Sequence, residues 1–166
     1  MKIFSPLQNR LKFIIIAFVS AAAVVFASLF FVAPAHSEPV SQFFLGHSYA
    51  LVIDGRDFPL EIANTAPLQH EGLSGRADLP SDSGMLFVMN EPQYIGIWMK
   101  DMQFPIDIIW LNADREIVTI ERGVTPDTYP EVFYPADLSQ YVLETNAGFV
   151  ESHGLQLGDS LEFVER

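Results

Sequence analysis

Charged side chains lie within the most apolar part of the sequence after the N-terminal segment, and their chemistry needs an explanation. The segment 84–112 is rich in apolar and aromatic residues, yet it contains Lys100 and Asp107. A carboxylate on a buried strand is costly unless it is paired or hydrogen-bonded. A lysine in such a strand either extends over its neighbours to water or pairs with a carboxylate. Asp107 is therefore a structural partner or a general base or ligand anchor, and Lys100 is a structural residue or a cation for an acidic ligand.

Two further polar side chains alternate within a second apolar segment. Glu144 and Asn146 lie two residues apart, so on a strand they share one face. If that face points inward they line a pocket, and if it points outward they are only solvated. Arg76 follows the glycines of a predicted helix end, where it either holds the last helical carbonyls or clamps a carboxylate. Trp98 precedes Lys100 by two residues and shares its strand face.

These residues together predict a polar groove for a small ligand or a peptide segment. Trp98 would supply a flat apolar contact, and the charges would set the orientation of the ligand. We expect a non-catalytic binding or accessory module that needs no cofactor. The predicted lining residues are Arg76, Trp98, Lys100, Asp107, Glu144 and Asn146.

Two other functions stay open. The first is an enzyme acting on cell-envelope carbohydrate, in which Asp107 and Glu144 are paired carboxylates and one has a raised pKa. That chemistry requires both carboxylates to face a common cleft at about 5–10 Å from each other. The second is a purely structural or assembly module, in which the same charges form salt bridges.

Other kinds of site have little support in the sequence. The chain has no cysteine, which excludes a thiolate nucleophile and a thiolate metal site. Three of its four histidines, His47, His70 and His153, lie far apart without the spacing of metal ligands, so no metal is expected. Methionines of the central segment are expected to pack the core in preference to binding Cu(I). They are Met85, Met89, Met99 and Met102.

Residues 1–35 have the pattern of a targeting segment. Three basic residues precede an uncharged apolar run of 21 residues at 13–33, and Ala-Pro-Ala at 33–35 fits a small-x-small cleavage site. The run is also long enough to span a bilayer, which takes about 20 residues. The segment is therefore either a signal peptide cleaved near Ala35 or an uncleaved membrane anchor. Both alternatives place the remainder outside the cytoplasm, in the periplasm or the extracellular space.

Acidic residues far outnumber basic ones. The sequence has 9 Lys+Arg and 21 Asp+Glu, a net charge of −12. Residues 1–35 contain three of the bases and no acid, so the remainder has 6 bases against 21 acids and a net charge of −15. This charge argues against nucleic acid and anionic membranes as partners. We expect a self-repelling monomer that contacts a membrane only through an uncleaved N-terminal segment.

The elements that would position the polar residues are short strands. Apolar, β-branched runs bounded by turn residues predict strands, and Asp54-Gly55 predicts a tight hairpin turn between the first two. Helical segments are expected at 65–74 and 149–153. The central strands are apolar on both faces, which predicts that both faces are covered. The expected strands cover residues 48–53, 58–63, 84–88, 95–99, 106–111, 116–121, 141–146 and 161–164.

About eight short strands and one or two short helices predict an α+β fold dominated by β-structure. We expect a small closed or half-closed barrel. The expected organisation is a signal peptide or N-terminal anchor at 1–35, a linker at 36–47, and a single folded domain at 48–166.

Five motifs in order resemble those of the DUF192 family. They are GLSGR at 72–76, GMLF at 84–87, WMKD at 98–101, PIDII at 105–109 and VLETNAG at 142–148. The resemblance covers about residues 48–165. The family has no known function, so the resemblance implies a compact β-rich fold, often exported, and no established activity. Family members commonly have Met where Ser74 stands and Asn-Thr where Asp101 and Met102 stand, beside Lys100.

Overall fold

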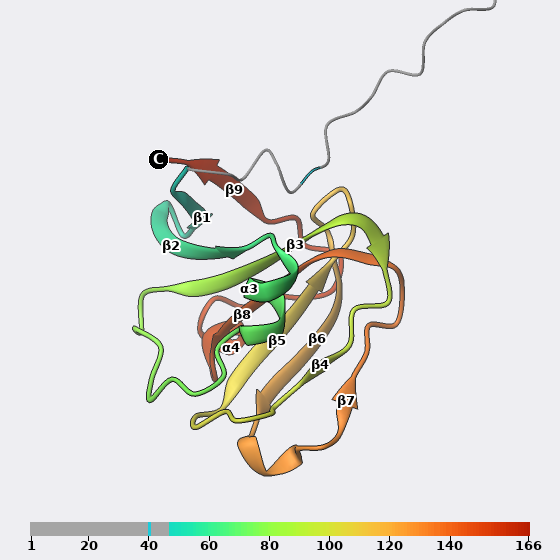
Figure 1. The fold of residues 1–166 in the computed structure, drawn as a ribbon. Coiled ribbons are helices and arrows are strands. Elements are labelled where there is room, and N and C mark those ends of the chain that lie inside the picture. The colour runs from blue at the N-terminus through green and yellow to red at the C-terminus, as the bar shows by residue number, and fades with distance from the viewer. Residues whose placement is uncertain (1–39, 41–46) are drawn as a thin grey trace, which may run out of the picture. The chain divides into compact units, whose positions relative to one another are not determined.

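Seven strands form one mixed sheet in the part of the chain that the computed structural model describes, which is Val40 and residues 47–166 (Figure 1). Their order across the sheet is β6-β5-β8-β3-β2-β1-β9, and all neighbours are antiparallel except β2 and β3. The predicted signal peptide or anchor and nearly all of the predicted linker lie outside the described residues. The strands are β1 (Tyr49–Ile53), β2 (Arg56–Ala63), β3 (Gly84–Gln93), β5 (Ile106–Leu111), β6 (Ile117–Val124), β8 (Ser139–Asn146) and β9 (Glu162–Glu165).

Short elements complete the described part of the chain. A two-stranded antiparallel sheet joins β4 (Ile97–Trp98) to β7 (Val132–Phe133). The crossover between the parallel strands β2 and β3 carries the helix α3 (Ala66–Glu71), and α4 (Phe149–Ser152) follows β8. A 3-10 helix, η1, covers Pro126–Thr128. No helix in this part of the chain is long and apolar enough to cross a membrane.

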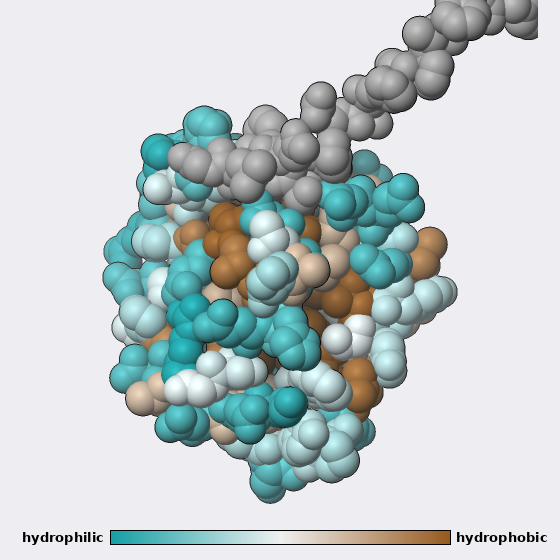
Figure 2. All heavy atoms as spheres, viewed as in Figure 1, coloured by the Kyte–Doolittle hydropathy of each residue, from teal (hydrophilic) through white to brown (hydrophobic). Residues whose placement is uncertain are grey.

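Apolar side chains pack on both faces of the large sheet, as the strand pattern predicts. On β3, Leu86 points to one face and Phe87 to the other, since side chains alternate along a strand. The α4-side core contains Leu86, Leu143 and residues of α4, whereas the α3-side core contains Phe87, Trp110 and Leu73. Figure 2 shows mostly hydrophilic surface on one side of the molecule, with apolar surface in separate patches. Most of the apolar area is therefore used to hold helices and loops against the sheet.

The expected closed or half-closed barrel is not formed, because the sheet is open and β6 and β9 lie at its two ends. A single bridge joins Glu116 to Ser160, and it does not extend into a ladder between the edge strands. The physical reason lies in the segment before β9. Phe149 of α4 and the loop residues Leu155 and Leu161 fill the α4-side core, so apolar side chains there are covered without further strand pairing.

The predicted hairpin and the central strand are confirmed. Asp54 and Gly55 have positive φ angles of 51° and 70°, as the tight turn between β1 and β2 requires. The strand β5 has the predicted bounds. Other elements differ in length: β3 continues to Gln93, β4 has only two residues, and α3 ends at Glu71 because Gly72 has a positive φ. The β-dominated α+β class is confirmed.

Candidate functional site

Two adjoining hollows lie between α3 and β4 on the α3 side of the sheet. The inner hollow has a volume of about 60 Å³ and contacts the buried residues Leu73, Phe87 and Glu144. The outer hollow has a volume of about 250 Å³ and contacts Lys100 and Asp101. Their shared lining residues are His70, Glu71, Ser74 and Trp98.

Hydrogen bonds connect the two walls of these hollows. The hydroxyl of Ser74 donates to the carbonyl oxygen of Lys100 at 2.9 Å, and the Gly75 amide donates to the carbonyl oxygen of Asp101 at 2.8 Å. The segment that follows α3 is thereby held against the turn that follows β4. The hydroxyl of Ser74 therefore stabilises this junction.

Glu144 is the only acid of the described residues that is buried without a hydrogen-bond partner at its carboxyl group. It is 5% exposed and lines the inner hollow. Burial raises the pKa of Glu144 to about 8, and the positive charge of Arg76 acts in the opposite direction. The carboxyl group is therefore mostly protonated at pH 7, and it presents a hydrogen-bonding group to the hollow.

Trp98 and Lys100 stack beside the hollows. The Trp98 side chain remains 44% exposed, and the ring of Tyr129 meets it edge-on at 6.0 Å between centroids. The Lys100 Nζ lies 5.9 Å from the centroid of the Trp98 ring, which is within the range of a cation–π contact. Lys100 therefore extends over Trp98. The sequence predicts either this arrangement or a pair between Lys100 and a carboxylate.

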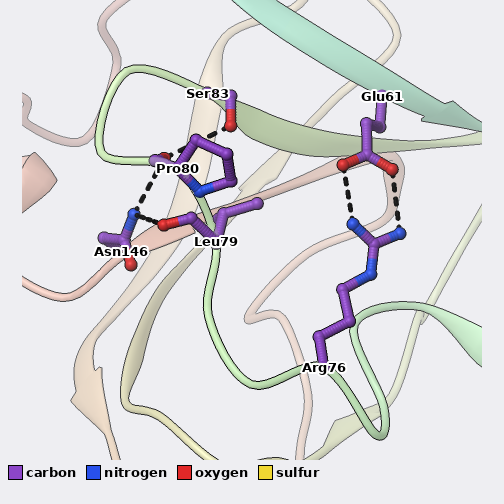
Figure 3. Close-up of polar contacts among 6 residues, drawn as sticks. All are labelled: Glu61, Arg76, Leu79, Pro80, Ser83 and Asn146. Carbon is purple, nitrogen blue, oxygen red and sulfur yellow. Dashed lines mark hydrogen bonds and ion pairs between the residues drawn. The ribbon is translucent and has the colours of Figure 1, made fainter.

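Arg76 clamps a carboxylate, but that carboxylate is Glu61 of β2 (Figure 3). The Nη1–Oε1 distance is 2.6 Å and the Nη2–Oε2 distance is 2.8 Å. This bidentate hydrogen bond lowers the pKa of Glu61. Arg76 lies at the rim of a separate hollow that also contacts Met85, so it does not line the inner or outer hollow.

Asp107 is a structural anchor on the opposite face of the sheet. It is 1% exposed, and its Oδ1 accepts a hydrogen bond from the Gly123 amide at 2.8 Å. Its Oδ2 accepts from the amides of Gly148 and Val150 at 3.0 and 2.9 Å. The carboxylate thus holds β6 and the start of α4 against β5.

The pairing of β5 with β8 separates Asp107 from Glu144. Ile108 lies opposite Glu144, and Asp107 lies opposite Thr145. Directly paired residues point to the same face, and consecutive residues point to opposite faces. Asp107 and Glu144 therefore do not face a common cleft, which is what a pair of catalytic carboxylates requires.

Asn146 also has a structural role. Its Nδ2 donates to the carbonyl oxygens of Leu79 and Pro80 at 2.9 and 3.1 Å (Figure 3). These bonds attach the loop before β3 to the end of β8. Of the six residues predicted to line a groove, the structure brings Trp98, Lys100 and Glu144 to the two hollows and holds the other three in structural contacts.

The sequence reasoning did not identify the lining residues that α3 contributes. His70 and Glu71 end this helix and face both hollows. Their only sequence signal is that they directly precede the GLSGR motif. The described residues contain no group of three or more His, Asp or Glu side chains that could hold a metal ion.

The fold defines a β-dominated α+β domain with an open sheet covered on both faces. The chain belongs to the DUF192 family, whose model is described as "Uncharacterized ACR" and matches residues 49–163.

Two solved structures are similar to this domain. A protein from Sinorhizobium meliloti, described as a candidate transcription regulator, is 30% identical with a TM-score of 0.64, and the match covers 70% of this chain and 92% of that one. A protein of unknown function from Novosphingobium aromaticivorans is 29% identical with a TM-score of 0.63, and the match covers 69% and 83% of the two chains. No curated protein matches the chain.

Proposed function

We propose that this protein is an exported, non-catalytic domain that binds a small polar ligand or a peptide segment in the hollows beside Trp98. The observation that carries the proposal is the carboxyl group of Glu144. This group makes no hydrogen bond to another described residue and lines the inner hollow, so its hydrogen-bonding capacity is available to a ligand there. An exposed tryptophan next to such a group is typical of a binding site.

The sequence supports the exported location. An apolar run at 13–33 follows three basic residues and precedes Ala-Pro-Ala, a pattern that directs a chain out of the cytoplasm whether or not it is cleaved. The absence of cysteine means that the domain needs no oxidising compartment to fold. The apolar cores on both faces of the sheet can provide the stability that disulfides often supply in exported domains.

A binding role is favoured over carbohydrate hydrolysis because of the sheet register. Asp107 is saturated by three backbone amides and points away from Glu144. Glu144 therefore has no partner carboxylate on the sheet, and the other acids that line the hollows, Glu71 and Asp101, are exposed residues of α3 and of the turn after β4.

The proposed function is tested by a ligand screen with a matched pair of variants. Thermal-shift and NMR measurements of the folded domain would be made with amino acids, short peptides, sugars and small amines. We expect at least one class to bind, and Trp98→Ala to weaken that binding tenfold or more. Tyr94→Ala is the control, since Tyr94 is 59% exposed and lines neither hollow. Binding that both variants lose equally, or no binding from any class, would contradict the proposal.

A further inference from the structure

The chemistry around the Glu144 carboxyl group restricts the kind of ligand that can reach it. The neighbouring strands present only apolar side chains on this face, Met85 and Phe87 from β3 and Ile106 and Ile108 from β5. The charged or titratable groups come from β2, α3, the loop after α3 and the turn after β4. They are Glu61, His70, Glu71, Arg76, Lys100 and Asp101.

The nearest fixed cation is already engaged. Both Nη atoms of Arg76 donate to the carboxylate of Glu61, and no hydrogen bond joins Arg76 to Glu144 among the described residues. Glu71 lines both hollows, and Asp101 lines the outer hollow together with Lys100 and His70. Three acidic side chains, those of Glu71, Asp101 and Glu144, therefore line the two hollows, against the one ammonium of Lys100.

The side of the outer hollow that Trp98 forms already holds an ammonium group, that of Lys100. Lys100 places its Nζ 5.9 Å from the Trp98 centroid, which shows that the aromatic face is accessible to a cation at this point. The indole face attracts cations through its quadrupole. An incoming cation would replace or share this position on its way to the inner hollow.

The two hollows adjoin each other and together can take a short extended cation. The inner hollow has a volume of about 60 Å³ and the outer hollow one of about 250 Å³. A primary ammonium has three N–H groups that it can donate to a carboxylate. A quaternary ammonium has no N–H to donate, so it cannot supply the hydrogen bond that the Glu144 carboxyl group lacks.

We infer that the site recognises a primary alkylammonium, such as a small amine or a lysine side chain, whose –NH₃⁺ enters the inner hollow and donates to the carboxylate of Glu144. This inference rests on the proposed function and specifies its ligand class. On binding, the proton of the Glu144 carboxyl group leaves to solvent, and the new ion pair replaces the buried neutral acid. Trp98 covers the aliphatic part of the ligand.

The test is an NMR titration of the folded domain with n-butylammonium, compared with butyrate, 1-butanol and tetramethylammonium. We expect n-butylammonium to shift the amide signals of Gly72, Ser74 and Gly96, and the other three probes to have no such effect. Affinity should rise by up to about tenfold per pH unit from pH 6.5 to 8, because Glu144 must lose its proton while an alkylammonium, with a pKa of about 10.4, keeps its own.

Two variants separate this site from general attraction to an acidic protein. Glu144→Gln is close in shape to the protonated acid and should lower the affinity at pH 8 at least tenfold and remove its pH dependence. Glu131→Gln makes the same change in net charge at an exposed residue outside the hollows and should leave the affinity unchanged. Unchanged amide signals away from the site would verify that each variant is folded.

The opposite results would overturn the inference and leave the proposed function standing. If butyrate binds and its affinity falls as the pH rises, Glu144 acts as a neutral hydrogen-bond donor to an anion. If n-butylammonium causes no localised shifts, or binds equally to Glu144→Gln, the ammonium site does not exist. The broader ligand screen then decides separately whether the domain binds anything else.

Discussion

The two buried carboxyl groups of this domain have opposite surroundings. Asp107 accepts three hydrogen bonds from backbone amides of β6 and the start of α4. Glu144 comes one residue before Thr145, the β8 partner of Asp107, and points to the other face. Its carboxyl group receives no hydrogen bond from the described residues, and its pKa is raised. Asp107 thus joins β5, β6 and the start of α4, whereas the carboxyl group of Glu144 remains available to a ligand in the inner hollow.

Replacing Asp107 should destabilise the fold. Asp107→Ala leaves the amides of Gly123, Gly148 and Val150 without their acceptor, at about 1–3 kcal/mol for each buried group. We expect a loss of about 3–5 kcal/mol in the free energy of unfolding, measured by urea denaturation. Asp78→Ala, at an exposed residue, should change it by less than about 0.5 kcal/mol. A loss below about 1 kcal/mol for Asp107→Ala would contradict the anchoring role.

Glu144 should make the domain less stable as the pH rises. Its pKa is about 8 in the folded chain and 4.5 as the ordinary value. Between these values the folded state holds a proton that the unfolded state has lost, so this contribution to stability is full below pH 4.5 and declines up to about pH 8. The slope can reach about 1.4 kcal/mol per pH unit.

The corresponding measurement is urea denaturation at pH 5, 6, 7 and 8. Glu144→Gln should remove most of the decline, because glutamine does not titrate. The other titrating groups are present in both proteins and cancel in the difference between them. Parallel pH profiles for the wild-type protein and the variant would show that the pKa of Glu144 is not raised.

At the scale of elements, the junction of β3 with β8 depends on the absence of a side chain. Gly84 begins β3, and a Cβ atom there would lie 2.9 Å from the carbonyl oxygen of Glu144 and 3.0 Å from a ring carbon of Phe58. The carbonyl belongs to the backbone of a central strand and cannot move without shifting the sheet. This close contact gives a physical reason for the glycine that opens the GMLF motif.

Gly84→Ala should therefore cost about 1–3 kcal/mol, as overpacking of a core typically does. It should also shift NMR signals along β8. Gly55→Ala is a useful comparison, since a Cβ there meets nothing within 4 Å and only its positive φ of 70° opposes the change. We expect about 1 kcal/mol for that variant and no effect on β8. A neutral Gly84→Ala would contradict the close-contact explanation.

At the scale of the molecule, charge dominates the surface. The chain has a net charge of −12, and like charges repel most strongly in the compact folded state. The described residues form four ion pairs, all at least partly exposed. Exposed pairs contribute little to stability, so the net effect of the charges is repulsion.

Salt should therefore stabilise this domain. Raising NaCl from 10 to 500 mM shortens the screening length to a few ångströms and should raise the Tm by about 2–5 °C, which corresponds to about 1 kcal/mol for a domain of this size. Differential scanning calorimetry at a fixed pH measures this shift. A Tm that falls with salt would show that attractive ion pairs outweigh the repulsion.

The sequence by itself determined the positions of most strands, the two-sided burial and the family. A β-branched apolar run closed by turn residues predicted Ile106–Leu111 at its true bounds, and Asp54-Gly55 predicted the hairpin, because both signals are local in the chain. Motif order identified the family independently of any spatial contact.

Only the tertiary structure decided what the polar residues do. Whether Arg76 meets Glu61 or a ligand, and whether Asp107 and Glu144 share a face, depends on sheet register and on packing between residues distant in sequence. The same holds for the open sheet, because α4 and the loop before β9 cover the core that a closed barrel would have covered with paired strands. Local patterns constrain which side chains are buried, whereas long-range pairing decides which of them meet.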